Sequence, residues 1–148
     1  MQMSFNLPEI DREETKKAVE AALEKYQMYL LMEPIERLPK ITTTYTLVPP
    51  SNTNAFHSTT EDTAISKVDF EQEKERYMER IRRAVNRLNY HERSIIIRRY
   101  LDQEERFDYE VYNDLGMSER KYYRVKARAF YKLAFILRIE VYKKKVES

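Results

Sequence analysis

Cationic side chains near the carboxyl end are the residues best suited to chemistry, because their spacing follows one face of a helix. Arg120, Lys121 and Arg124 come shortly after Ser118, with Tyr123 among them. Arg and Lys donate hydrogen bonds to guanine edges in the major groove of DNA, and Arg often makes two at once. The pattern predicts that four residues read bases: Arg120, Lys121, Tyr123 and Arg124.

A second group of side chains suits the DNA backbone. Hydroxyl and cationic groups bind phosphate oxygens, which fixes the register of a protein on DNA without reading sequence. We expect such contacts from Tyr109, Ser118, Arg128, Tyr131 and Lys132. Residues 118–145 hold ten Lys/Arg and two acids, whereas the whole chain carries a net charge of +2. A basic end on an acidic remainder favours a polyanion binder, and a solvated Lys/Arg helix face is the alternative.

These side chains require a short helix, a tight turn and a longer helix. Residues 107–115 are predicted to form the first helix, and Gly116 to end it in a left-handed conformation. Gly116 is the only glycine of the chain. Ser118 is then predicted to cap the second helix. Apolar spacings of three and four place one set of side chains inward: Val111, Leu115, Tyr122, Val125, Ala129, Leu133 and Ile136.

The remaining sequence predicts an all-α protein in three parts. Residues 1–33 hold an amphipathic helix, whose stripe is Val19, Leu23, Tyr26 and Leu30. That stripe must pack against the rest of the chain or against a second copy. Residues 34–66 contain four prolines among Ser, Thr and Asn, which predicts a linker or an ordered arm.

Residues 67–148 are predicted to form the helix-turn-helix DNA-binding domain. Before the motif we expect a helix at 67–88 and another at 91–101, the latter capped by Asn89 with Glu92. The apolar face of the first comprises Phe70, Tyr77, Ile81, Ala84, Val85 and Leu88. A further stripe comprises Ala127, Phe130, Ala134, Leu137 and Val141, and it could pack against residues 91–101 or form a dimer seam.

The sequence carries little that indicates catalysis. Without cysteine, and with one glycine, it cannot hold a thiolate metal site, a phosphate-binding loop or a nucleophile elbow. Asp102, Glu104 and Glu105 are interpreted as a solvated turn, and two distant histidines, His57 and His91, give little support for zinc. We therefore predict no enzyme activity, no cofactor and no metal. No apolar run reaches membrane length and residues 1–14 lack a signal-peptide pattern, so we expect a cytoplasmic protein.

The carboxyl half resembles the domain of bacterial sigma factors that recognises the −35 promoter element, called region 4. The resemblance lies in RSIIIRRYL at 93–101, Tyr109, Leu115-Gly116, Ser118 and the pattern Arg128-Ala129 with Lys132-Leu133. It implies that the helix after Gly116 reads promoter DNA. One departure is Tyr112, which stands where such motifs place a small residue and predicts a wider angle between the two helices.

Nearly the whole chain resembles the ArpU-type phage late-gene regulators, which are related to RinA-like activators. The resemblance lies in EKYQMYLL, in PKITTTY at 39–45, and in IRRAVNRLNYHERSIIIRRYL with YNDLGMSERKYYRVKARAFYKLA. It implies an activator of phage packaging and lysis genes in the host bacterial cell. Contact with host RNA polymerase is implied in the same way.

Other functions remain open at this point. A small-terminase-like subunit that marks phage DNA for packaging would also be helical and would form rings. A sigma-like factor would be monomeric on DNA and bound to RNA polymerase, whereas a reader of paired half-sites would be a homodimer. A purely structural interaction module would tolerate the loss of Arg120, Lys121 and Arg124.

Overall fold

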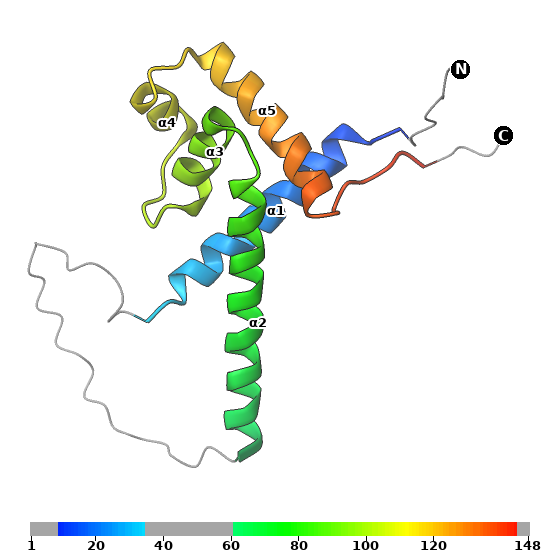
Figure 1. The fold of residues 1–148 in the computed structure, drawn as a ribbon, viewed down its shortest axis with the longest axis vertical. Helices are drawn as coiled ribbons and strands as arrows, with labels where there is room; N and C mark the ends of the chain where they lie inside the picture. The colour runs from blue at the N-terminus through cyan, green and yellow to red at the C-terminus, as the bar shows by residue number, and fades with distance from the viewer. Residues whose placement is uncertain (1–8, 35–60, 145–148) are drawn as a thin grey trace, which may run out of the picture.

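The computed structural model describes residues 9–34 and 61–144, with the side chains of 61–65 excepted. Every regular element in these ranges is a helix, which confirms the predicted all-α class. In Figure 1, α1 crosses α2, and α3, α4 and α5 gather at one end of α2. None of the described helices is both long and apolar enough to span a membrane. The helices are α1 (Arg12–Leu31), α2 (Glu61–Asn86), α3 (Tyr90–Ile96), η2 (Ile97–Leu101), α4 (Asp108–Asp114) and α5 (Glu119–Ile136).

Helix α1 packs into the same core as the carboxyl half. Asp11 caps it, since its side chain accepts a hydrogen bond from the amide of Glu14 at 3.1 Å. Val19, Leu23 and Tyr26 are buried as predicted, and the fourth residue of the stripe, Leu30, is half-buried. Their partners come from α2, η2 and α5. The stripe is therefore covered by the rest of the chain.

Helix α2 begins earlier than the sequence indicated. Its first six residues, 61–66, lie in the region assigned to the linker or arm, and residues 35–60 of that region are outside the described residues. No Pro or Gly occurs between 51 and 66, so local chemistry gives no reason for the helix to begin at 67. Of the predicted apolar face, Tyr77 is half-buried and Phe70 is exposed. The remaining four are buried: Ile81, Ala84, Val85 and Leu88.

The predicted helix at 91–101 is two elements. Asn89 and Glu92 form the expected capping box, with reciprocal bonds of 2.9 and 3.1 Å between each side chain and the other's amide. After α3 the chain widens into the π-helical turn η2, where the amide of Asp102 donates to the carbonyl of Ile97 at 2.9 Å. A π turn contains one residue more than an α turn, and this changes the direction of the side chains that follow it. Periodicity cannot reveal such a turn, because η2 is only five residues long.

Helix α4, the turn and α5 follow the predicted local structure. Gly116 has φ of 66°, and Ser118 caps α5. The amide of Met117 donates to the carbonyl of Tyr112 at 2.9 Å, and that of Gly116 to Asn113 at 3.1 Å. These two bonds form a Schellman motif, which ends α4 sharply and lets α5 begin within four residues.

A second Schellman motif ends α5, but it is built on an arginine. Ile139 donates to Ala134 at 2.9 Å and Arg138 to Phe135 at 3.2 Å, while Arg138 has φ of 60°. A side chain in this left-handed region is strained, and glycine is not. We expect Arg138→Gly to raise the free energy of unfolding by about 1 kcal/mol in urea titrations. Arg138→Ala keeps a Cβ at that φ, so an equal gain from this control would show that the side chain and not the backbone is responsible.

Two clusters of buried side chains divide the interior. The larger joins α1, α2, η2 and α5, with Leu23, Ile81 and Leu133 fully buried in it. The smaller lies under the turn, where Ile95, Val111 and Tyr122 are fully buried. Tyr112 fits at the edge of the smaller cluster, with its ring 5.5 Å from that of Tyr122. Helix α5 contributes buried side chains to both clusters, and this packing fixes the orientation of its outward face along the whole helix.

The segments before α1 and after α5 pair with each other. The amide of Asp11 donates to the carbonyl of Val141 at 2.8 Å, and that of Lys143 to Glu9 at 2.8 Å. The hydroxyl of Thr15 both donates to and accepts from the backbone of Val141, at 3.1 and 3.0 Å. We call this pairing of residues 9–15 with 139–143 the terminal clasp. It fixes the first turn of α1 beside the end of α5 (Figure 1).

Candidate nucleic-acid interface

The start of α5 is held by its cap. Ser118 Oγ accepts from the amide of Lys121 at 3.2 Å, and its carbonyl accepts from the amide of Tyr122 at 2.9 Å. A hydroxyl that accepts one bond can still donate its proton to a phosphate oxygen. The amino end of a helix also carries a partial positive charge that attracts phosphate. Ser118 is therefore exposed at the amino end of α5, and its contact with phosphate stays a prediction.

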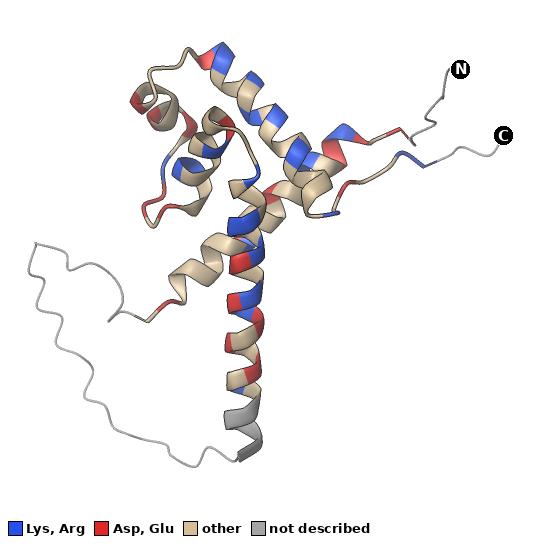
Figure 2. Ribbon diagram, in the orientation of Figure 1, with Lys and Arg blue, Asp and Glu red and all other residues tan. Residues whose placement is uncertain are grey.

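The outward face of α5 carries the side chains that the sequence analysis selected. All four predicted base readers, Arg120, Lys121, Tyr123 and Arg124, are exposed, and so are Arg128 and Tyr131. Figure 2 shows Lys and Arg recurring along α5 from its first turn to the place where α1 crosses it. The opposite face is buried, with Tyr122, Ala129 and Leu133 fully enclosed. The helix thus presents a cationic, aromatic-bearing surface on a fixed support; we call it the α5 face.

The cations of the α5 face have no acidic partner among the described residues. Ion pairs elsewhere occupy Arg82, Arg83, Arg99 and Arg106, but none involves Arg120, Lys121, Arg124 or Arg128. An unpaired, hydrated guanidinium can bind phosphate or a base edge without first breaking an internal ion pair. This availability distinguishes the α5 face from the salt-bridged surface of α2.

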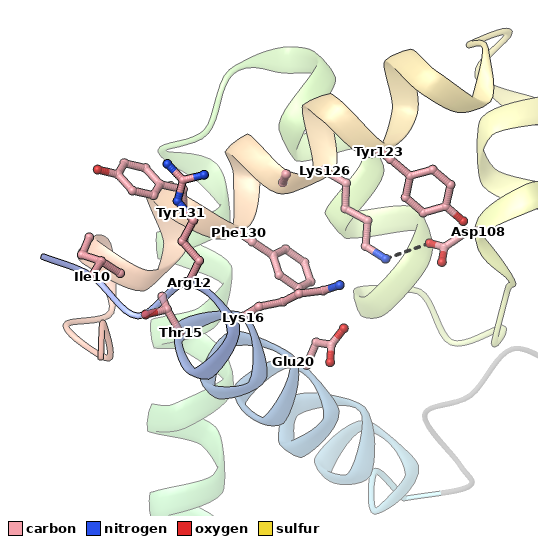
Figure 3. A pocket seen from close by; sticks show the side chains of 11 residues that line it. Ile10, Arg12, Thr15, Lys16, Glu20, Asp108, Tyr123, Lys126, Phe130 and Tyr131 are labelled. Atoms are coloured by element: carbon pink, nitrogen blue, oxygen red, sulfur yellow. Dashed lines mark hydrogen bonds and ion pairs between the residues drawn. The ribbon is translucent and has the colours of Figure 1, made fainter. Parts of the chain in front are cut away.

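A partly buried ionic network connects α4 to α5. Asp108 Oδ1 accepts from Tyr122 OH at 2.6 Å, from Lys126 Nζ at 3.0 Å and from Arg99 Nε at 3.2 Å. Lys126 is 9% exposed and also lies over the rings of Tyr100 and Phe130. Figure 3 shows its ammonium group directed at Asp108. The network joins α4, α5 and η2 at one carboxylate, so it sets how α4 lies against the α5 face.

The network also shifts the acidities of its members. Burial raises the pKa of Asp108, but hydrogen bonds from Tyr122 and Lys126, with the charges of Lys126 and Arg99, outweigh it and hold the pKa below its ordinary value. Burial, followed by the hydrogen bond to Asp108, raises the pKa of Tyr122. The carboxylate therefore stays ionised and the phenol protonated at neutral pH. Sequence analysis did not find this network, because its members are separated by up to 27 positions and share no motif.

Lys132, another predicted backbone contact, forms an ion pair with Glu92. Its Nζ lies 2.9 Å from Oε1 of Glu92, and the Glu92 side chain is fully buried. A buried carboxylate needs a positive partner to offset its desolvation, so Lys132 is committed to α3. It lies at the border of the α5 face, where the sequence alone does not separate a phosphate-binding lysine from a core ion pair. We exclude Lys132 from the DNA contacts proposed below.

Tyr109 is exposed at the start of α4, as its predicted role requires. Its ring stacks on that of Phe107, with centroids 5.9 Å apart and planes 7° from parallel. Phe107 was not among the predicted site residues, because its sequence context is that of an ordinary apolar residue at the start of a helix. The contact of Tyr109 with phosphate stays a prediction.

The acidic turn and the described histidine are both exposed and have other partners. Arg106 lies 3.8 Å from Asp102 and 3.6 Å from Glu104, in a turn whose acids are exposed. His91 is exposed and contacts the ring of Tyr90 edge-on. His57 lies outside the described residues.

Comparison with known proteins places the chain among phage proteins. It is 39% identical over 143 residues to an uncharacterized phage-related protein of Listeria innocua, a match that covers 97% of this chain and 100% of that protein. It is 31% identical over 140 residues to protein Gp66 of Listeria phage A118, covering 93% of this chain and 96% of Gp66. The chain belongs to this family of phage-related proteins. No family model and no solved structure matches it.

The match to this phage-related family is not confined to the carboxyl half. Because 143 of the 148 residues align with the first relative, the alignment includes α1 as well as α4 and α5. The terminal clasp and the α5 face of this chain therefore both lie within the part that it shares with that relative.

Proposed function

We propose that this protein is a sequence-specific DNA-binding transcription regulator that reads promoter DNA with the start of α5. The unpaired cationic α5 face carries this proposal. An α-helix with its side chains is about as wide as the major groove, so the exposed first turns of a capped helix can reach base edges. Arg120, Lys121, Tyr123 and Arg124 read bases in this proposal. Tyr109, Ser118, Arg128 and Tyr131 bind phosphates.

The biological role we propose follows from the family and from the resemblances in the sequence. A phage-related protein with a reading head like region 4 of sigma factors fits an ArpU-type activator of late genes. It would act in the host cytoplasm, on double-stranded DNA and together with host RNA polymerase. A homodimer would read two half-sites about one helical turn apart, and a monomer on polymerase would read one.

The test is capture of genomic DNA. Fragments of the source genome are captured with the purified full chain at near-physiological salt and sequenced, and the capture is repeated with Arg120→Ala, Lys121→Ala and Arg124→Ala combined. We expect enrichment of one or a few promoter-like sites, and a tenfold or greater loss of affinity for them in the triple variant, since each good base contact contributes about 1–3 kcal/mol.

A charge-matched variant separates base reading from general attraction. Lys17→Ala, Arg76→Ala and Arg83→Ala remove three exposed cations from α1 and α2, and this variant should still enrich the same sites. Equal, weak capture of all fragments by the three proteins would overturn the base-reading role of α5. Specific capture by a large ring-shaped oligomer would instead assign the protein to DNA packaging.

A further inference from the structure

A groove separates the first turns of α1 from the flank of α5. Its volume is about 460 Å³. Arg12, Lys16 and Glu20 lie along the α1 side, and Tyr123, Phe130 and Tyr131 are among the residues on the α5 side. In Figure 3, Arg12 lies beside Tyr131 and Lys16 extends below Phe130. Tyr123 and Tyr131 belong both to this groove and to the α5 face, so the groove is continuous with the proposed reading surface.

The groove has two cations that form no ion pair with a described residue. Lys126 and Asp108, which also line it, pair with each other at 3.0 Å. Arg12 and Lys16 make no ion pair within the described part of the chain, and Glu20 is the remaining acid in the lining. Arg12, Lys16 and Glu20 recur every four residues, so all three lie on one side of α1.

Most acids at the start of α1 are engaged elsewhere. Asp11 caps the helix, and Glu14 pairs with Lys17 at 3.4 Å. Glu9 pairs with Lys143 at 3.3 Å. Glu13 lines a neighbouring hollow with Tyr142 and not this groove, whereas Arg12 lines both. The groove itself therefore keeps a net positive character.

The position of these cations is fixed before any ligand arrives. The terminal clasp holds the backbone on either side of Arg12, through Asp11 and Thr15. Val19 and Leu23, which follow Lys16 on α1, are fully buried in the larger core. Cations on a rigid support lose little conformational entropy when they bind, except that of their own side chains.

DNA supplies the matching chemistry at this place. A helix that enters the major groove has a phosphate backbone on either side, because the groove is only about as wide as the helix. Side chains beside the flank of such a helix therefore face phosphates and not bases. We propose that the groove between α1 and α5 receives one DNA strand's phosphodiester backbone, with Arg12 and Lys16 binding two of its phosphates. This inference rests on the proposed function and extends the DNA interface to α1.

The experiment measures affinity against salt for the full-length protein. Fluorescence anisotropy is recorded with a duplex containing a captured site and with an unrelated duplex, between 50 and 200 mM salt. Arg12→Ala with Lys16→Ala should weaken binding to both duplexes by a similar factor. It should also reduce the slope of log affinity against log salt by about two, because each phosphate contact contributes about 0.9 to that slope.

The control is Lys17→Ala with Arg83→Ala, which removes two exposed cations outside the groove and should leave the slope unchanged. Thermal melts should show that both variants fold, since all four side chains are exposed. An unchanged slope in Arg12→Ala with Lys16→Ala, while the wild type still prefers the captured site, overturns the α1 contact alone. Absence of any preference in the wild type overturns the proposed function instead.

A free anion is the other source of phosphate chemistry. Inorganic pyrophosphate is therefore added at constant ionic strength to the wild type and to Arg12→Ala with Lys16→Ala. A rise in the melting temperature of the wild type only, combined with an unchanged DNA slope, would assign the groove to a small anion. That result would overturn the proposal that the groove receives a DNA strand.

Discussion

Replacing Asp108 by Ala is expected to lower the free energy of unfolding by about 3 kcal/mol, because it leaves a buried ammonium without its partner. Lys126 is 9% exposed, and Tyr122, whose hydroxyl donates to the same oxygen, is fully buried. Arg99 loses its acceptor as well. Urea unfolding followed by circular dichroism measures the change. Asp114→Ala, at the other end of α4, breaks only the half-exposed pair with Arg106 and should cost less than about 1 kcal/mol.

The same carboxylate gives a pH dependence with a defined sign. The folded pKa of Asp108 is lower than the ordinary aspartate value of 3.8, so its contribution is complete above that value and is lost as the pH falls further. The wild type should therefore lose stability more steeply than Asp108→Asn below pH 3.8. Parallel curves for the two proteins in that range would show that Asp108 contributes nothing as a charge.

Lys132→Met is expected to lower the free energy of unfolding by about 3 kcal/mol, although Lys132 lies on a cationic helix, because it leaves the fully buried Glu92 carboxylate without its cation. The Glu92 carboxylate is fully buried, and its Oε2 has no hydrogen-bond partner among the described residues. Without Lys132, the hydrogen bond donated by the amide of Asn89 is the only one that Glu92 Oε1 keeps with a described residue. The methionine keeps the aliphatic part of the side chain, so the measured loss reports the charge.

Two further variants test the Lys132 interpretation. Arg128→Met, one turn earlier on the exposed side, should leave stability unchanged within about 0.5 kcal/mol. Glu92→Gln combined with Lys132→Met should recover part of the loss, since the buried charge is gone. If Lys132→Met weakens DNA binding and leaves unfolding unchanged, the lysine binds phosphate as the sequence analysis predicted.

Much of the local structure could be predicted because short-range chemistry determines it. Three helix ends were predicted from hydrogen bonds within a few residues, and the structure confirms all of them. They are the capping box of Asn89 with Glu92, the left-handed Gly116 and the cap Ser118. The packing of α1 could not be predicted, since an apolar stripe shows that a partner exists but not which one. The π turn at η2 was missed because it interrupts a helix without Pro or Gly.

The candidate site was also predictable only in part. Helical spacing correctly placed Arg120, Lys121 and Arg124 on an exposed face, because exposure follows from which residues are buried opposite them. Spacing could not identify Asp108 as the acceptor for Lys126, 18 residues later, since that contact depends on how α4 lies against α5. The base-reading and phosphate-binding roles stay predictions until DNA is captured.

The terminal clasp has a consequence for synthesis of the chain. Thr15 and Val141 are 126 positions apart, and Glu9 and Lys143 are 134 apart. During translation α1 leaves the ribosome well before α5 and before residues 141–143, which pair with the start of α1. Contacts of such long sequence separation form late, because the chain must first close a large loop. The nascent chain therefore cannot complete its core, or fix Arg12 beside α5, until residues 141–143 have left the ribosome.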